Sequence, residues 1–298
     1  MQAGVPPSSI AVITFTRLAA QELIDRLGAD YKDGIFIGTI HSLAAHFLVL
    51  NGLGAHISKV AEDEEFDKLF DLCQDLNLYH SYDWICLDEA QDCGEKELDF
   101  IFDLIDPVHY FVAFDDRQSI YGFRGARPDV LHDYLDHNET AYYSLNENFR
   151  NGALILDYAK AILKPIKMRD NSIPMRNVNG HVISAKFSAK DLIANINSNG
   201  NYKDWAILCR VNSGVEYIMS ILEDNEIPCV TFKQGDLNKA KLEKIMASNT
   251  VKVLTAHSSK GLEWDNVATY KLWWGGAEER RLNYVAATRA RNLLIMYK

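Results

Sequence analysis

Two adjacent acids, Asp88 and Glu89, directly follow an apolar run that extends from Trp84 to Leu87. Such a run is typical of a buried strand, and in open parallel sheets ligands bind beyond the carboxyl ends of the strands. Mg2+ prefers oxygen ligands and usually takes only one or two protein carboxylates, and a second acid beside it can polarise an attacking water. The pair is therefore a candidate magnesium–nucleotide site. The alternative is a solvated strand–helix turn whose acids are favoured by the helix dipole.

A second candidate segment is FDDRQSIYGFRGARPDV, which follows the next apolar run. It contains an amide, Gln118, and two aromatic residues, Tyr121 and Phe123, interleaved with Arg124 and Arg127. Aromatic faces beside basic side chains suit stacked single-stranded bases. Taken alone, the same segment is equally well explained as a packed loop.

Three further segments place basic or hydroxyl side chains at the ends of expected elements. Arg150 comes just after a strand-like stretch in LNENFRNG. The segment LTAHSSKGLEWDNV is rich in hydroxyls and has Gly261 in a turn. In EERRLNYVAATRARN the apolar spacing predicts a helix that buries one face and presents Arg289 to a neighbour.

The elements that must position these residues alternate between short apolar runs and amphipathic helices. The expected strands are 10–15, 35–40, 84–88, 110–115, 141–145, 181–187, 205–210, 251–256, 266–271 and 293–297. The expected helices include 17–27 and 213–226. Strands that are apolar throughout and alternate with helices indicate parallel sheets covered on both faces. The many strands, and a loose polar stretch at 164–180, predict two α/β domains that divide near residue 140.

Composition narrows the class of protein. The chain has 298 residues, 48% of them hydrophobic and 24% charged, as in soluble globular proteins. Its longest apolar runs have the length of strands, so no transmembrane span is expected. The five cysteines form no CxxC pair, which fits a reducing, cytoplasmic location. The net charge of −10 gives no global attraction to nucleic acid, so any such site must be a local groove.

Taken in order, these segments resemble the motifs of the UvrD/Rep family of superfamily 1 DNA helicases. Residues 14–23 resemble motif Ia, 38–48 the next DNA-contact motif, and 87–92, 115–126, 145–150, 255–264 and 284–291 motifs II to VI. The resemblance runs from about residue 4 to the end of the chain. The combination of QSIYGFRGA, HSSKGLEW and YVAATRA in this order makes it very specific.

The resemblance implies two RecA-like motor domains of the P-loop NTPase type, with ATP in the cleft between them. The first would be residues 1–140, with motifs Ia to III, and the second 141–298, with motifs IV to VI. Asp88 would hold Mg2+, and Glu89 would activate the water that attacks the γ-phosphate. The remaining nucleotide-site residues would be Gln118 as γ-phosphate sensor, Arg150 and Arg289 as arginine fingers, Glu263 at the ribose, and Gly261. Arginine suits phosphate because its planar fork grips the oxygens and stays charged.

The resemblance also implies a site for single-stranded DNA or for junctions of single and double strands. The implied contact residues are Thr16, Arg17, Thr39, His41, Tyr121, Phe123, His257 and Ser258. Three of the implied roles have local alternatives. His41 could simply cap a helix that begins near it, Tyr121 could be a core residue, and Arg289 could pair with Glu278 or Glu279 on the surface.

The sequence departs from the family pattern in one major respect. No GxxxxGK[ST] phosphate loop occurs in it, and that loop supplies backbone N–H groups, a lysine and a hydroxyl to the nucleotide and its metal. We therefore expect the first domain to lack its N-terminal strand and phosphate loop. A fragment, a misplaced start and a partner chain that supplies the missing piece are the explanations left open.

Smaller departures occur elsewhere. Phe114 stands where the family usually has a small glycine, and Arg117 where an acid is common. Residues 49–82 are expected to hold only a short helical segment, and 228–250 a short strand and DLNKAKLEKIMAS. Whole subdomains are inserted at these points in large relatives, so a compact motor core, with or without a protein partner, is expected here.

Three functions compete at this point. The first is an ATP-dependent helicase or translocase that uses Mg2+ and moves 3′ to 5′ on single-stranded DNA, in a bacterial or viral-type setting. The second is a DNA-binding or regulatory module that no longer hydrolyses ATP. The third is a nuclease built on Asp88, Asp92, Glu95 and Lys96, which is disfavoured because its acids lack a second-metal partner at a clear spacing.

Overall fold

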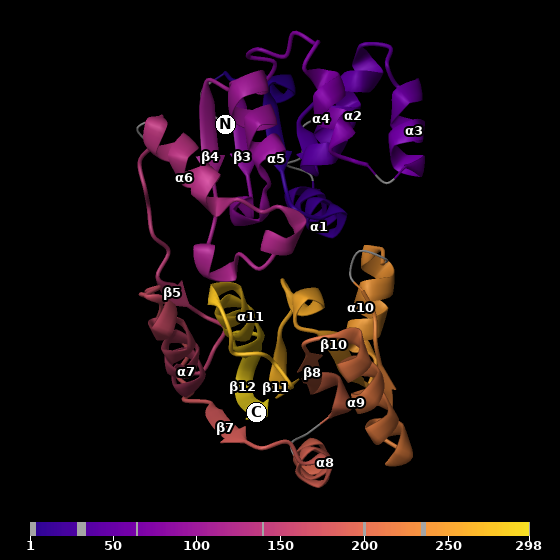
Figure 1. The fold of residues 1–298 in the computed structure, drawn as a ribbon, viewed down its shortest axis with the longest axis vertical. Coiled ribbons are helices and arrows are strands. Elements are labelled where there is room, and N and C mark those ends of the chain that lie inside the picture. The colour runs from indigo at the N-terminus through magenta and orange to yellow at the C-terminus, as the bar shows by residue number, and fades with distance from the viewer. Residues whose placement is uncertain are drawn as a thin grey trace. The chain divides into compact units, whose positions relative to one another are not determined.

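The computed structural model describes residues 4–28, 34–63, 65–138, 140–198, 201–233 and 237–297. The chain forms two compact units, Met1–Ala141 and Tyr142–Lys298, and Figure 1 shows a separate sheet with its own helices in each. The predicted α/β fold with mainly parallel sheets is confirmed in both units. None of the described helices is long and apolar enough to cross a membrane.

The described strands of the first unit form a parallel sheet in the order β2-β1-β3-β4. Their bounds are β1 Ile10–Ile13, β2 Phe36–Gly38, β3 Trp84–Leu87 and β4 His109–Val112. Each lies within or next to a predicted strand and ends before the polar residues that follow it. The sheet therefore presents those residues at one edge.

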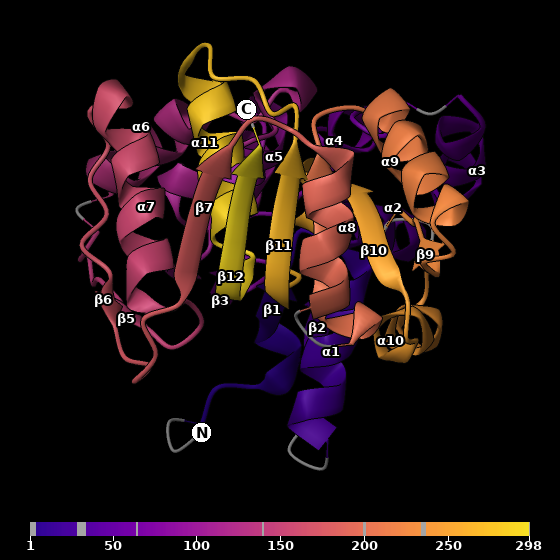
Figure 2. The same cartoon turned by 90° about the horizontal axis from the view of Figure 1, so that it is seen from below.

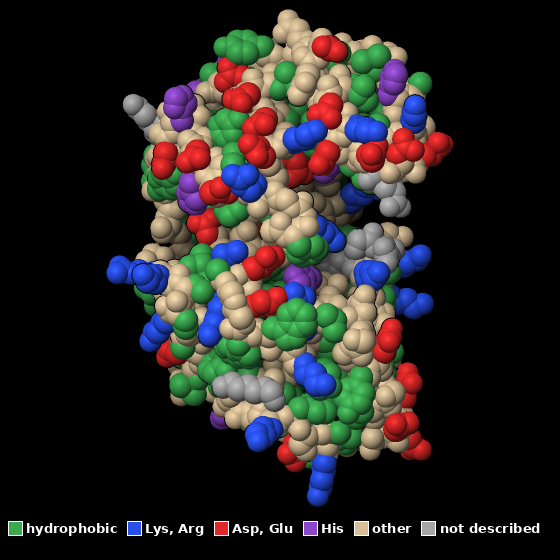
Figure 3. Space-filling view, in the orientation of Figure 1, with side chains coloured by type: hydrophobic (Ala, Val, Ile, Leu, Met, Phe, Trp, Pro, Cys, Tyr) green, Lys and Arg blue, Asp and Glu red, His purple; other side chains and the backbone are tan. Residues whose placement is uncertain are grey.

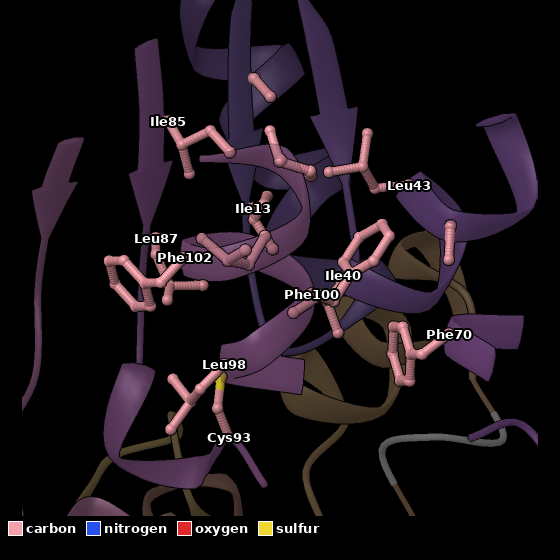
Figure 4. Packing of buried hydrophobic residues seen from close by; sticks show 14 of the residues in the cluster. Ile13, Ile40, Leu43, Phe70, Ile85, Leu87, Cys93, Leu98, Phe100 and Phe102 are labelled. Atoms are coloured by element: carbon pink, nitrogen blue, oxygen red, sulfur yellow. The ribbon is translucent and has the colours of Figure 1, made fainter. Parts of the chain in front are cut away.

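Most helices of the first unit cover one face of this sheet. They are α2 Ile40–Leu50, α4 Lys68–Cys73, α5 Glu95–Asp99, which continues into a π-helical turn at Phe100–Ile105, and α6 Pro128–His137, while α3, Ala55–Glu62, packs on α4. Figure 4 shows Ile13, Ile85 and Leu87 of the sheet facing apolar side chains of these helices. The expectation of one short helical segment in 49–82 is wrong, because α3 and α4 both form there and α4 buries Leu69, Phe70 and Cys73.

The opposite face of the first sheet is covered by α1, Arg17–Leu27, which has the predicted bounds. Its cover is partial, because Trp84 of β3 remains 37% exposed and Phe111 of β4 64% exposed. A pocket of about 460 Å3 lies between α1 and this face, and Asp88 and Thr14 are among its lining residues. The open face gives Asp88 a route to solvent.

The second unit has a larger parallel sheet in the order β7-β12-β11-β8-β10-β9, and Figure 2 shows β7, β12, β11 and β10 side by side with α8, Ala189–Ser198, in front of the sheet. The bounds are β7 His181–Ala185, β8 Trp205–Cys209, β9 Cys229–Val230, β10 Val251–Thr255, β11 Trp264–Tyr270 and β12 Ala290–Tyr297. Every residue of β8 is buried, as expected for a strand covered on both faces. Helices α8 and α9, Asn212–Asp224, pack their apolar residues on one face.

The other face of the second sheet is covered by α7, Ala153–Leu163, and α11, Ala277–Ala287, which also contact each other. The short strand predicted in 228–250 forms as β9, and helix α10, Lys239–Ala247, follows it within DLNKAKLEKIMAS. The helix predicted in 278–292 forms as α11 and buries Leu282 and Val285.

One predicted strand does not form. In the described segment 140–198 no strand occupies 141–145, and only the short β5, Glu147–Asn148, follows, paired with β6, Ile173–Pro174. The apolar letters of this stretch suggest a buried strand, but Tyr143 is 92% exposed and Leu145 95% exposed. An apolar run becomes a strand only where a neighbouring strand can accept its hydrogen bonds.

Candidate active site

Parallel pairing brings the first unit's predicted site residues to one edge of the sheet. Ile13 of β1 is paired with Gly38 of β2 and Leu87 of β3, so the residues after all three strands are at the same level. The ladder continues one step past the strands, because Asp88 N–H donates to Ile13 O over 2.9 Å and Thr14 N–H donates to Gly38 O over 2.9 Å. This level is the carboxyl edge at which ligands bind in open α/β sheets.

The two acids occupy this edge with different backbones. Asp88 is exposed and one of its carboxylate oxygens accepts the N–H of Glu89 at 3.0 Å. Glu89 has φ 55° and ψ 38°, a left-handed conformation that costs a non-glycine residue about 1–2 kcal/mol. The Glu89 side chain therefore leaves the backbone in a different direction from that of a residue in a strand or a right-handed helix.

A buried amide links Glu89 to the segment after β4. Gln91 is completely buried and donates from Nε2 to Glu89 Oε2 over 2.5 Å, while its Oε1 accepts the N–H of Asp115 at 2.9 Å. Asp115 in turn accepts from Gln118 Nε2 at 2.8 Å and pairs with Arg117. A chain of polar contacts thus joins the two candidate segments. Sequence reasoning did not single out Gln91, although an amide between the acids of DEAQD is the signal that could have found it.

Asp88 suits Mg2+, which takes one or two protein carboxylates and completes its shell with water or phosphate oxygens. Its exposed carboxylate borders the 460 Å3 pocket described above. Among the described residues, no group of three or more His, Cys, Asp or Glu side chains is arranged to hold a metal by itself. The nuclease hypothesis gains no support, because Lys96 pairs with Asp71 and Glu95 with Arg127.

Two predicted DNA-contact threonines begin helices. Thr16 caps α1 by accepting the N–H of Ala19 at 3.1 Å, and Thr39 caps α2 by accepting the N–H of Ser42 at 3.3 Å. Arg17, the first residue of α1, is exposed. Both helices therefore begin at the carboxyl edge of the sheet, where their N-terminal N–H groups favour anions.

The aromatic segment after β4 lies beside the start of α1. Tyr121 stacks on Phe15 with ring centroids 5.3 Å apart, so it is half-buried, and burial raises the pKa of its hydroxyl to about 12. Phe123 is 65% exposed, and the Arg124 guanidinium lies 5.6 Å from its ring centre and 5.2 Å from that of Tyr121. Tyr121 therefore serves the packing of the segment, and Phe123 presents its ring to solvent.

His41 follows Thr39 in the first turn of α2, so the alternative that His41 caps this helix is wrong. Its ring packs on Phe70 at 5.0 Å between centroids, and its Nδ1 lies 3.6 Å from Glu97 Oε1. Acidic and basic side chains are intermixed over the face of the first unit shown in Figure 3. This face of the first unit therefore shows no broad basic surface, and the local nucleic-acid groove stays a prediction.

In the second unit, two predicted nucleotide contacts form an ion pair. Arg150 Nε donates to Glu263 Oε2 over 2.5 Å, and Arg291 lies 3.7 Å from the other carboxylate oxygen. Both residues of the pair are partly exposed, Arg150 by 36% and Glu263 by 40% of the side chain. Next to them Phe149 is 67% exposed, an aromatic ring that sequence reasoning did not single out.

Two residues that sequence reasoning also missed hold Arg150 in place. Asn151 is completely buried and donates to the carbonyls of Thr288 and Ala290 over 3.0 and 2.6 Å. Arg176 donates to the carbonyl of Arg150 over 2.8 Å and to that of Arg291 over 2.9 Å. The segment after β5 is thereby tied to the start of β12.

Arg289 lies in the interior of the second unit, with 2% of its surface exposed. Its guanidinium donates to the carbonyls of Val285 and Leu262 over 3.0 and 3.2 Å. The surface pairing with Glu279 does not form, because Glu279 binds Arg210 through both carboxylate oxygens. A role at a phosphate remains a prediction that requires the guanidinium to leave these carbonyls.

The predicted DNA and nucleotide residues of the second unit lie at opposite edges of its sheet. His257 and Ser258 follow the end of β10, where the Ser258 N–H donates to Thr255 Oγ1 over 3.3 Å. Glu263 and Arg289 directly precede β11 and β12, which run parallel to β10. Gly261, with φ 85°, lies in the turn between the two groups, a conformation that favours glycine.

Helicase family models match residues in both units. A family model described as the UvrD/REP helicase N-terminal domain matches residues 1–77 and 70–139, and one described as the UvrD-like helicase C-terminal domain matches 232–298. The probable DNA helicase II homolog of Mycoplasma capricolum is 28% identical over 167 residues, 50% of this chain and 22% of that protein. The probable DNA helicase of Mycoplasma pneumoniae is 26% identical over 249 residues, 72% of this chain and 43% of that protein.

The match thus spans less than half of either relative. Among solved structures, the C-terminal domain of a possible DNA helicase from Lactobacillus plantarum WCFS1 is 18% identical and covers 50% of this chain and 86% of that chain, with a TM-score of 0.38. That score is too low to assign a fold, so the fold assignment rests on the parallel sheets of this chain.

Proposed function

The chain belongs to the UvrD/Rep family of helicases, and from that premise we propose that it is the motor core of an ATP-dependent DNA helicase or translocase. Its proposed track is single-stranded DNA, including junctions with double strands, and its proposed direction is 3′ to 5′. A cytoplasmic location and a protein partner belong to the same proposal. Only part of each relative is matched, so these properties are proposed for this chain rather than transferred to it.

The observation that carries the proposal is the polar chain from Glu89 through Gln91 and Asp115 to Gln118. In a motor of this kind, the nucleotide site must be structurally coupled to the DNA site. Here the candidate general base contacts an amide that contacts the segment bearing Phe123, and Gln91 is shielded from water in between. Buried polar networks hold their members in one arrangement when all are satisfied.

The proposed chemistry is phosphoryl transfer to water. Mg2+ bound at Asp88 would neutralise phosphate charge, which together with positioning accounts for most of the catalysis of such reactions. Glu89 accepts a proton from the attacking water, and Gln118 orients groups at the γ-phosphate. Arg150 contributes positive charge from the second unit, Glu263 binds the ribose, and the exposed ring of Phe149 suits stacking on the base.

A non-hydrolytic DNA-binding module is the second candidate, because the exposed ring of Phe123 beside Arg124 would serve DNA binding whether or not the chain hydrolyses ATP. Both candidates predict binding to single-stranded DNA. They differ in whether Glu89 matters, because only a hydrolase needs a base beside the metal.

The decisive experiment measures ATP hydrolysis by the chain with Mg2+, with and without single-stranded DNA. Hydrolysis that DNA stimulates and that Glu89→Gln abolishes, while DNA binding survives, supports the motor. The matched control is Glu95→Gln, an exposed acid of α5 paired with Arg127, which should hydrolyse ATP like the unmodified chain. DNA binding without hydrolysis by the folded chain would exclude ATP hydrolysis by this chain on its own and would support the second candidate.

A further inference from the structure

Glu97 is the third residue of α5 and makes contacts in two directions. Its Oε2 accepts the N–H of Gly94, the residue that caps α5, at 2.7 Å. Its Oε1 lies 3.6 Å from Nδ1 of His41, and only 16% of the side chain is exposed. One carboxylate therefore touches both the start of α5 and the start of α2.

Each of these contacts leads to one part of the candidate DNA interface. His41 is in the first turn of α2, two residues after the predicted contact Thr39. Gly94 pairs in antiparallel fashion with Ala126, which follows the turn at Gly122–Arg124 that carries Phe123. The approach is close, because a Cβ on Gly94 would lie 3.2 Å from the carbonyl oxygen of Gly125.

We propose that Glu97 is a positioning residue for single-stranded DNA binding, which joins His41 to the Gly94–Ala126 pair and so holds the two parts of the interface in one arrangement. The role rests on the proposed DNA-binding function. Glu97 itself need not touch DNA: it acts through the His41 ring and through the backbone that presents Phe123. A glutamine would keep both contacts, whereas an alanine would remove both.

The charges around Glu97 make this role sensitive to pH. Burial raises the pKa of the Glu97 carboxyl to about 7, the Gly94 N–H opposes this, and Asp67 and Asp92 add to it. Burial also lowers the pKa of His41, against the opposing effect of Asp67. The other charged groups of α5 have partners of their own: Lys96 pairs with Asp71, Glu95 pairs with Arg127, and Asp99 accepts a hydrogen bond from the Tyr134 hydroxyl at 2.8 Å.

The sign of the pH effect follows from these directions. As the pH rises through about 7, Glu97 changes from neutral to anionic, while burial favours the neutral form of His41. The new negative charge is next to the proposed DNA surface, and the burial of His41 disfavours a balancing positive charge there. Single-stranded DNA binding should therefore weaken with rising pH, and it should do so through Glu97.

The test is the affinity of the whole chain for a fluorescent oligothymidine at pH 6, 7 and 8 and constant ionic strength. For the unmodified chain we expect a loss of about threefold from pH 6 to 8, as one added charge at moderate distance produces in water. Glu97→Gln should bind like the pH 6 form and lose this dependence. Glu97→Ala should bind about tenfold more weakly at every pH, because its former partners are left unpaired.

Two controls separate the possible failures. Glu95→Gln, two residues earlier on the same helix, should keep the pH dependence. In the absence of DNA, the His41 imidazole signals in NMR spectra should shift on Glu97→Gln. Unchanged His41 signals, or a pH dependence that persists in Glu97→Gln, would overturn the positioning role alone. Failure of the unmodified chain to bind at any pH would overturn the proposed function and this role with it.

Discussion

Arg150 and Glu263 are 113 positions apart in the sequence, and the Arg150 Nε donates to Glu263 Oε2 over 2.5 Å. The second unit thus already holds together the residue expected at a phosphate and the residue expected at a ribose. A pre-formed pair of this kind limits the rotamers of a long arginine side chain before any ligand arrives. Preorganised charge of this sort costs no rearrangement at the moment of reaction.

The first prediction separates the two members of this pair. Arg150→Ala should lower kcat for ATP hydrolysis by about a thousandfold, the lower end of the effect of an arginine finger. Glu263→Gln should raise KM for ATP, because it removes the proposed ribose contact, and it should lower kcat less than Arg150→Ala does, because Arg150 loses only its partner. Steady-state hydrolysis with saturating DNA measures both effects.

The matched control for this prediction is Glu279→Gln, which breaks another arginine–carboxylate pair of the second unit, with Arg210. It should leave both constants unchanged if the effect is specific to the site. Equal losses in Glu279→Gln and Glu263→Gln would mean that ion pairs stabilise the unit in general and that Glu263 has no particular role.

The second prediction concerns two exposed phenylalanines of the first unit. Phe123 and Phe111 are 65% and 64% exposed, but only Phe123 has a guanidinium over its ring. Phe123→Ala should weaken binding to single-stranded DNA by about 1–3 kcal/mol, the usual contribution of one stacked base. Phe111→Ala should leave the affinity unchanged, because Phe111 lies on the open face of the sheet beside α1.

Affinity measured by fluorescence anisotropy, with thermal unfolding of each variant as a check, decides between these outcomes. Neither substitution should destabilise the unit much, since both rings are mostly in water. Equal affinities for the two variants would remove Phe123 from the interface and leave the Tyr121 segment as a packed loop.

The third prediction uses a buried lysine in β10. Lys252 is completely buried and donates to the carbonyls of Ser248 and Thr250 over 2.8 and 2.9 Å. Burial lowers its pKa from 10.5 to about 8, with Asp204 opposing the shift and Lys203 adding to it. Between these two values the unfolded chain binds one more proton at this site than the folded chain. The free energy of unfolding should therefore rise with pH over that interval.

The measurement is urea unfolding of the unmodified chain and of Lys252→Met at pH 7.5, 9 and 10.5. The difference between the two free energies of unfolding should shift in favour of the unmodified chain by on the order of 2 kcal/mol across the interval. Tyrosines also titrate near the upper end, but they are common to both proteins and cancel in the difference. A difference that stays constant with pH would show that Lys252 keeps its ordinary pKa.

Much of the local structure was predictable because it depends on neighbours in the sequence. Helix α1 has the predicted bounds, and the strands β1, β3 and β8 end where polar residues interrupt the apolar runs. The placement of Asp88 at the carboxyl end of β3 follows from the same pattern. The stretch 141–145 shows the limit of this reasoning, because its apolar residues found no strand to pair with and remain exposed.

The sequence alone determined the family, the two α/β units' parallel strands and the residue types of the candidate site, since these depend on motif order and short-range periodicity. Only the tertiary structure decided which side chains meet. It buried Arg289 against Val285, paired Arg150 with Glu263, and placed Gln91 and Glu97 between candidate segments. Such contacts join residues tens to more than a hundred positions apart. Their formation depends on how sheets and helices pack, and local sequence patterns do not specify that packing.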